Sequence, residues 1–442
     1  MQEKLKIKRT SLMKWFTIFI ALYPILNVYS VLKLPLGDLV ALFFCAIFII
    51  DNIQNALVEI NLIPHKNIYY FFLIYVFASL PIMLIFSERI DFEEIASKSI
   101  HLLLYFFMAF LLGVYYIKID YLVELIKKYT TLFCYVIILQ QLLSIFANVK
   151  TYLLLPILKL NYLYSDYSDY LQVYMATLKT QGYRPSAFFL EPAHACAYII
   201  IGFVLLLFTS NKKRKDYIHI FVCIIAIASS YSTGGIITAF AMLCYYIFTT
   251  RGRKISKKET VFKFSLFVFL AIGILALVSY ETRVLSLIVS RIESIGTNLY
   301  NSTGNIRVLR GWYVWNELPI INRVFGTGIG NLLQEIENNG ILVLSDAFYM
   351  DDMNLLFCSM CTFGIVGSIL YFYSFFRSMG KKRFKHALCY SYFVSCLYSN
   401  WIYHALSILI MIVIFYDYEI NAFENARIKG DCNENYIKKN NI

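Results

Sequence analysis

Gly182-Tyr-Arg-Pro-Ser-Ala-Phe-Phe-Leu-Glu-Pro-Ala-His194 is followed at once by an apolar run that starts at Ala195 and continues to about residue 209. A run of this kind is long enough to enter a hydrocarbon core that is roughly 30 Å thick. Arg184, Glu191 and His194 stand directly at its start. Titratable side chains at the edge of a membrane span usually serve chemistry or transport. The stretch therefore predicts a membrane helix with a functional end.

The composition of the whole chain extends this prediction. Hydrophobic residues make up 59% of the 442 residues and aromatic residues 17%, whereas a soluble domain is about half apolar. We therefore predict an all-α polytopic integral membrane protein, a single membrane-embedded domain over 1–442. The windows long enough to span are 15–32, 35–50, 68–86, 99–117, 128–149, 193–209, 217–231, 233–249, 262–280, 354–376, 386–400 and 401–417. About twelve spans follow, with ten or eleven as the alternative, because the second and seventh windows are short and the last two nearly touch.

The basic residues give an independent test of this map. With a cytoplasmic N-terminus, most of the 40 lysines and arginines fall in the inside loops, as short cytoplasmic loops require. This distribution predicts cytoplasmic termini at both ends. The net charge of +12 is therefore mostly a topology signal. The same basic clusters would be attracted to anionic headgroups of the lipid bilayer. No nucleic-acid partner is expected, because the basic clusters lie in separate short loops.

Two long segments face outward in this topology, approximately 150–192 and 281–353, and we expect function there because long loops in compact domains usually bind or catalyse. The second contains five arginines and no lysine. Arginine's planar guanidinium suits bidentate recognition of phosphate. The segment therefore suggests an anionic ligand, with solvated or carboxylate-paired surface arginines as the plain alternative for those at 283, 291 and 323.

Arg307 and Arg310 stand out within that segment. Ser302-Thr-Gly-Asn305 is typical of a turn before a short helix, and residues three apart on a helix share a face. The two guanidinium groups are thus expected to hold one diphosphate. Trp312 and Trp315 follow; their rings either stack on sugar faces or anchor the segment at the membrane interface, and both interpretations stay open.

In the opening motif, Pro192 suits the first turn of a helix, and a helix N-terminus attracts anions. Arg184 is close enough in sequence to meet an anion bound there, while Glu191 or His194 is suited to take a proton from a hydroxyl. The alternative is structural: Glu191 pairs with Arg184, and His194 caps the turn.

Other patterns carry weaker signals. Gly326-Thr-Gly-Ile-Gly330 resembles part of a phosphate loop, but it lacks the following Lys-Ser/Thr and faces outward, so no nucleotide is expected. Asp351-Asp-Met-Asn354 stands where the second long segment re-enters the membrane, and its carboxylates suit a general base. It offers too few oxygen ligands for a divalent metal. Cys358 and Cys361 form an isolated C-x-x-C, which favours ordinary packing. We therefore predict neither a metal nor a cofactor.

Together these patterns resemble a known family. Their order is the Arg184–His194 motif before a span, Ser229-Ser-Tyr-Ser-Thr-Gly-Gly235, Arg-x-x-Arg-Gly-Trp at 307–312, the glycine loop at 326–330, and Phe363-Gly-Ile-Val-Gly367. The chain is similar in this to the O-antigen polymerases of the Wzy type, within the wider group that includes O-antigen ligases. The resemblance covers mainly residues 182–367 and rests on short motifs.

The resemblance implies inverting, metal-independent glycosyl transfer at the outer face of the bacterial cytoplasmic membrane. The donor would be an undecaprenyl-diphosphate-linked oligosaccharide, and the acceptor a sugar hydroxyl on the next lipid-linked unit. A chain-length-regulating membrane protein is an implied partner. The residues implied for the donor diphosphate and its sugars are Arg184, Arg307, Arg310 and Trp312. Those implied for proton transfer and for placing the acceptor are Glu191, His194, Asp352 and Asn354.

Two other functions remain as alternatives. Ligases of this group usually carry a histidine beside the asparagine at the re-entry, whereas Asp351, Asp352 and Met353 precede Asn354 here, which favours a polymerase. A flippase for the same lipid-linked units would place charge inside its spans and show two related halves. The predicted spans are almost free of charge, and the two halves look unlike each other.

Overall fold

The computed structural model describes residues 2–31, 34–54, 69–87, 89–112, 117–151, 153–155, 159–160, 183–209, 214–249, 260–268, 309–341, 353–380 and 382–415. Within these ranges the chain is mostly helical, which confirms the all-α prediction. Residues 150–192 and 281–353, predicted to face outward, keep the names first and second outward segment from that prediction. Most of the first and much of the second lie outside the described residues.

The longer helices follow the predicted windows. They are α1 (Gln2–Leu26), α2 (Leu36–Gln54), α3 (Tyr69–Phe86), α4 (Phe92–Phe106), the π-helix η1 (Phe107–Leu112), α6 (Ile119–Phe146), α8 (Pro192–Phe208), α9 (Arg214–Ser229), α10 (Thr233–Phe248), α17 (Leu355–Ser378), α18 (Arg383–Cys396) and α19 (Ala405–Phe415). Residues 260–268 are also helical. Each predicted window therefore contains a described helix.

Length and composition single out fewer of these helices as membrane spans. Among the described residues, α6 and α17 are long and apolar enough to cross a membrane, and six shorter helices or helix parts are apolar. The last two predicted windows are separated more clearly than the sequence suggested, because α18 ends at Cys396 and α19 begins at Ala405.

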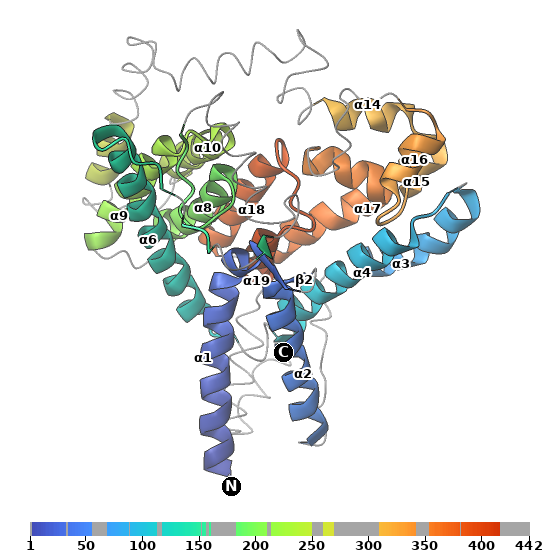
Figure 1. The fold of residues 1–442 in the computed structure, drawn as a ribbon, viewed down its shortest axis with the longest axis horizontal. Coiled ribbons are helices and arrows are strands. Elements are labelled where there is room, and N and C mark those ends of the chain that lie inside the picture. The colour runs from blue at the N-terminus through green and yellow to red at the C-terminus, as the bar shows by residue number, and fades with distance from the viewer. Residues whose placement is uncertain are drawn as a thin grey trace, which may run out of the picture.

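Helix α8 forms the centre of the main core. Every residue from Ala195 to Phe208 is buried, and a helix that is apolar on all sides is expected to be enclosed. It packs against α6, α9, α10 and α18. In Figure 1, α8, α10 and α18 lie between α6 and α9 at one edge and α17 on the other side. The core thus holds the helix that carries the opening motif in a fixed position.

A small antiparallel sheet ties the first outward segment to the start of the chain. Strand β1 (Tyr29–Val31) pairs with β2 (Leu34–Pro35) and with β3 (Lys159–Leu160). Ser30 is opposite Pro35, and Tyr29 is opposite Leu160. The sheet joins the turn between α1 and α2 to residues that follow α6.

The second outward segment contains three short helices beside α17: α14 (Arg310–Glu317), α15 (Ile320–Phe325) and α16 (Leu332–Asn338). Figure 1 shows all three at the edge of the molecule opposite α6 and α9. Helices α14 and α15 both contact α17. The segment is therefore a packed helical layer in its described part.

The glycine loop at 326–330 packs on a kink in α17. Gly364 leaves the helical conformation there, with φ 67° and ψ 179°. Thr327 N donates to Cys361 O at 2.9 Å, and Gly328 N donates to Thr362 O at 3.0 Å. A Cβ on Gly326 would lie 2.3 Å from Thr362 O. The glycines therefore allow two backbones to approach closely, which gives the motif a structural role.

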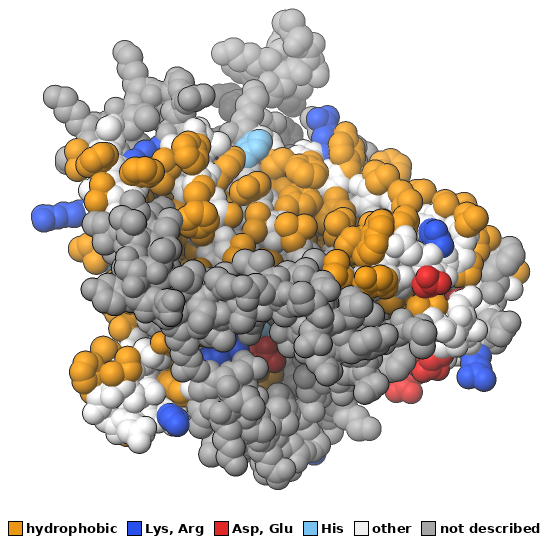
Figure 2. Space-filling view, turned by 90° about the horizontal axis from the view of Figure 1, so that it is seen from above, with side chains coloured by type: hydrophobic (Ala, Val, Ile, Leu, Met, Phe, Trp, Pro, Cys, Tyr) orange, Lys and Arg blue, Asp and Glu red, His pale blue; other side chains and the backbone are white. Residues whose placement is uncertain are grey.

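Large apolar side chains cover much of the described surface. Figure 2 shows hydrophobic side chains over most of the described part of one face, with charged ones mainly near its margins. Exposed examples occur on α3 at Ile85 and on α6 at Phe146, which is 82% exposed. Contiguous apolar surface of this kind marks a partner or a membrane.

Candidate functional site

The opening motif forms the N-terminus of α8. Glu191 is the N-cap residue, in extended conformation, and its side chain makes no capping hydrogen bond. Pro192 begins the helix, as predicted. Among the described residues, no ion pair joins Glu191 to Arg184. Arg184 interacts electrostatically with the thiol of Cys196, one turn into the helix. The structural alternative, an ion pair between Glu191 and Arg184, is thus not formed.

His194 contacts a second histidine that the sequence analysis did not select. The ring centroids of His194 and His404 are 4.6 Å apart. His404 ends the segment between α18 and α19, which we name connection 397–404. Its ring also lies 5.8 Å from that of Trp401, a largely buried side chain. The connection therefore brings an aromatic and titratable cluster to the N-terminus of α8.

The hydrogen bonding and the surroundings of His404 favour its neutral form. The backbone N–H of Leu406 donates to His404 Nδ1 at 3.2 Å, so the neutral ring carries its proton on Nε2. Burial, and then the nearby His194, lower the pKa of His404 well below its usual value. His404 is therefore a neutral N–H donor near pH 7, while His194 keeps no such hydrogen bond among the described residues.

Connection 397–404 also holds the point where the second outward segment rejoins the helices. Leu355 N donates to Ser399 O at 3.0 Å, and Asn400 Nδ2 contacts Cys358 Sγ at 3.2 Å. Asn354 is buried at the N-cap of α17, where its Oδ1 accepts from Phe357 N at 3.0 Å. This bond gives Asn354 a capping role; its role in placing an acceptor stays a prediction.

The Ser229–Gly235 motif lies between α8 and the connection. Ser230 Oγ is 2.9 Å from Cys196 Sγ, and Tyr398 OH donates to Gly234 O at 2.8 Å. Ser232 caps α10 by accepting from Gly235 N at 3.3 Å. The Ser229–Gly235 motif therefore packs against α8 at Cys196, two residues after the end of the Arg184–His194 motif.

Arg310 and Trp312 approach the same end of α17 from the second outward segment. Helix α14 begins at Arg310, whose side chain is only 1% exposed. The next residue, Gly311, is so close to Phe357 that an added Cβ would lie 2.4 Å from the Phe357 Cβ. The Trp312 ring is half-exposed and lies 5.8 Å from the Trp315 ring and 5.7 Å from the Phe357 ring. Burial of Arg310 and exposure of Trp312 assign them to opposite sides of α14.

Two selected residues cannot be placed in this way. Arg307 and Asp352 lie outside the described residues. The same holds for Asp351. Their proposed contacts with diphosphate and acceptor therefore stay predictions.

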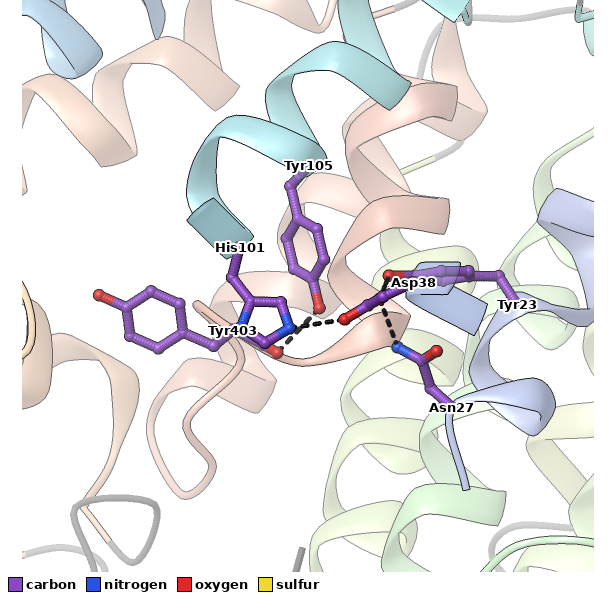
Figure 3. Close-up of polar contacts among 6 residues, drawn as sticks. All are labelled: Tyr23, Asn27, Asp38, His101, Tyr105 and Tyr403. Carbon is purple, nitrogen blue, oxygen red and sulfur yellow. Dashed lines mark hydrogen bonds and ion pairs between the residues drawn. The ribbon is translucent and has the colours of Figure 1, made fainter. Parts of the chain in front are cut away.

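The sequence analysis missed a second polar cluster, which Figure 3 shows beside Tyr403 of connection 397–404. Asp38, on α2, is buried. Its Oδ2 is 2.6 Å from His101 Nε2 on α4, while its Oδ1 accepts from Asn27 Nδ2 at 3.1 Å and from Tyr23 OH. An acid and a histidine inside two apolar windows were the available signal, since such residues in spans mark functional sites.

The two clusters share connection 397–404. Tyr105 OH donates to Tyr403 O at 2.9 Å, and Lys98 Nζ lies 4.9 Å from the centre of the Tyr403 ring. Tyr403 directly precedes His404 in the sequence. The Asp38–His101 cluster, through Tyr105, and the His194 cluster therefore contact adjacent residues of connection 397–404. No group of three or more metal-binding side chains occurs within the described ranges.

Comparison with known proteins adds no further constraint. A scan against protein-family models finds no match, and a search of curated proteins finds none either. Function must therefore be inferred from the residues and their geometry.

Proposed function

We propose that this chain is a Wzy-type polymerase: a glycosyltransferase that joins undecaprenyl-diphosphate-linked oligosaccharide units into a polysaccharide at the outer face of the bacterial cytoplasmic membrane. One observation carries the proposal. Connection 397–404 contacts His194 at the start of α8 and Leu355 at the start of α17. Tyr398 of the same connection donates to Gly234 O. The Arg184–His194 and Ser229–Gly235 motifs, which are far apart in the sequence, therefore both contact this connection beside the start of α17.

The proposal includes a membrane topology of about twelve spans with both termini in the cytoplasm. Support comes from the helix found in every predicted window, from the distribution of basic residues and from the exposed apolar side chains. In this topology the N-termini of α8 and α17 both face outward, where lipid-linked units are presented and nucleotides are absent.

The chemistry requires a cationic or dipolar site for the leaving group. The diphosphate gains negative charge in the transition state, and preorganised positive groups there lower the barrier. Arg184 and the N-terminus of α8 supply such groups. Neutral His404 adds an N–H donor without a competing positive charge. In this proposal Arg307 joins them at the diphosphate and the exposed Trp312 ring meets the donor sugars, whereas the buried Arg310 lies on the other side of α14.

The acceptor hydroxyl also needs a base, because a sugar hydroxyl is a weak nucleophile near neutral pH. Glu191 and His194 are the candidates in the opening motif. Glu191 makes no capping bond that would occupy its carboxylate, and His194 contacts His404. Both side chains remain suited to proton transfer.

The direct test is the surface glycan of a deletion strain that carries plasmid-borne variants. Arg184→Ala should reduce the glycan to single repeat units on a gel while the protein is present at wild-type level, because the leaving diphosphate loses its cation. Arg214→Ala is the matched control, since Arg214 is exposed at the start of α9, on the predicted cytoplasmic side. Wild-type chain lengths for Arg184→Ala would refute the donor role.

The same gel separates the alternatives. Unattached full-length polymer in the deletion strain would indicate a ligase, and repeat units trapped on the cytoplasmic leaflet would indicate a flippase. The flippase gains one observation from the structure, the contact between the buried Asp38 and His101 inside the helical body. Titratable residues within spans are common in transporters.

A further inference from the structure

We propose that Asp38 and His101 form a base dyad in which His101 takes the proton from the acceptor sugar hydroxyl and Asp38 holds the imidazole in place. The inference rests on the proposed glycosyl transfer and names a proton acceptor outside the opening motif. Its basis is the contact between an enclosed carboxylate and one nitrogen of a partly exposed imidazole, shown in Figure 3.

The hydrogen bond leaves the reactive nitrogen of His101 available. With Asp38 ionised, His101 Nε2 donates its proton to Oδ2 across 2.6 Å, so the lone pair of the neutral ring is on Nδ1. Among the described residues, no hydrogen bond reaches that Nδ1. The His101 side chain is 22% exposed, whereas that of Asp38 is 6% exposed. A proton donor can therefore approach the imidazole but not the carboxylate.

Asp38 is itself held rigidly. Its other oxygen accepts from Tyr23 OH and from Asn27 Nδ2, both on or directly after α1. A carboxylate fixed on one oxygen can orient the imidazole through the other and stabilise the imidazolium that forms. Three elements, α1, α2 and α4, thus define the direction of the His101 ring.

The dyad lies close to the proposed donor site. Tyr105, one turn beyond His101, donates to Tyr403 O, and the next residue, His404, contacts His194. Neighbouring residues have Cα atoms about 3.8 Å apart. In the proposed topology α2 and α4 both begin at the outer face of the membrane. The dyad therefore lies toward the face at which the lipid-linked units are presented. The two clusters therefore contact adjacent residues of connection 397–404, where the proposal places the donor and its acceptor.

The charged and titratable surroundings of His101 are few among the described residues. Lys98 precedes it by one turn on α4 and pairs with Glu94 at 3.4 Å. Tyr105 has its ring centroid 6.0 Å from that of His101. Asp38 is therefore the carboxylate bonded to this imidazole, and the dyad is a base with a single orienting partner.

The proposed step balances as follows. The acceptor O–H bond breaks and its proton passes to His101 Nδ1, while the oxygen forms a new bond to the anomeric carbon of the donor. The bond between that carbon and the diphosphate oxygen breaks, and its electron pair leaves with the diphosphate. His101 then returns the proton to water. The configuration at the anomeric carbon inverts, because attack and departure occur on opposite faces.

The test uses the purified full-length protein in proteoliposomes, with lipid-linked repeat units extracted from the deletion strain. His101→Ala should lower kcat on the order of 100-fold or more, since general base catalysis typically contributes that much. Added imidazole should restore part of the rate, because it can occupy the vacated space and accept the proton. His101→Gln, whose amide can still donate to Asp38, should melt like the wild type yet stay inactive with or without imidazole.

Two histidine variants serve as controls. His386→Ala should keep the wild-type rate, since this histidine bonds Gly380 O at the other end of α18. His194→Ala, if slow, should show no imidazole rescue. Rescue of His194→Ala in place of His101→Ala would overturn the dyad and assign the base to the opening motif.

Asp38 requires a separate measurement because it acts through His101. Asp38→Asn should lower kcat on the order of 10-fold or more with KM unchanged, since an amide misorients the ring and cannot stabilise imidazolium. An equal rise in KM, or a normal kcat, would assign Asp38 a purely structural role and overturn the dyad. If the wild-type protein forms no polymer, both the proposed function and the dyad fail. If the wild-type protein and His101→Gln are both active, the dyad alone is refuted.

Discussion

Gly364→Ala places a methyl group at the kink where α17 meets the glycine loop. The added Cβ would lie 2.1 Å from Val324 O and 2.5 Å from the Val324 carbonyl carbon. Both are backbone atoms, so relief requires movement of α15 relative to α17. The φ of +67° at Gly364 adds a second penalty, because residues with a Cβ rarely adopt this conformation.

These two effects determine how much Gly364→Ala destabilises the folded state. A residue held in such a region of backbone space costs about 1–3 kcal/mol, and overpacking a tight contact costs about 1–3 kcal/mol more. We therefore expect Gly364→Ala to destabilise the folded state by roughly 2–6 kcal/mol. The lower value applies if α15 can move far enough from α17 to relieve this contact.

Thermal melting in detergent micelles measures the effect, with Gly380→Ala as the matched control. Gly380 also has a positive φ, +57°, but no atom lies within 4 Å of its added Cβ. Gly380→Ala therefore measures the cost of backbone strain alone, a destabilisation of about 1–2 kcal/mol. The lower conformational entropy of the unfolded chain offsets part of this cost. Equal melting temperatures for the two variants would refute the close approach of Gly326 and Gly364.

Two further outcomes follow from the contacts around connection 397–404. Asn354→Ala should destabilise the protein by about 1 kcal/mol through loss of the α17 N-cap, whereas an unchanged melting temperature would show that the cap is dispensable. For His404, the folded-state pKa is lowered, so below its ordinary pKa of 6.5 the unfolded chain binds a proton that the folded chain does not. Wild-type stability should therefore fall as the pH decreases from 7 to 5, and His404→Asn should show a smaller fall in the same melting assay. Identical pH slopes would contradict a neutral His404 in the folded protein.

The positions of the helices were predictable because they depend on local composition. The run from Ala195 to Phe208 is apolar on every side, which requires burial wherever the helix lies, and the structure encloses it. Pro192 and Glu191 likewise marked the start of α8 correctly. Such signals come from residues that are close together in the sequence.

The parts that were missed depend on contacts between distant residues. Connection 397–404 contains Trp401, Ile402 and Tyr403, whose hydrophobicity is that of a span, so composition could not identify it as the segment on which the clusters meet. Asp38 and His101 are in separate apolar windows, and each alone is a single polar residue. The glycine loop matched a local phosphate-binding pattern, but its role is set by the kink at Gly364.

The place of connection 397–404 near the end of the chain also fixes an order of assembly. Membrane helices leave the ribosome in sequence, so α1, α2, α4 and α8 are made long before the residues that contact them. The Tyr105–Tyr403 and His194–His404 contacts form only once synthesis has passed α18. A nascent chain interrupted before that point has most of its helices but lacks connection 397–404, the segment on which the two polar clusters meet.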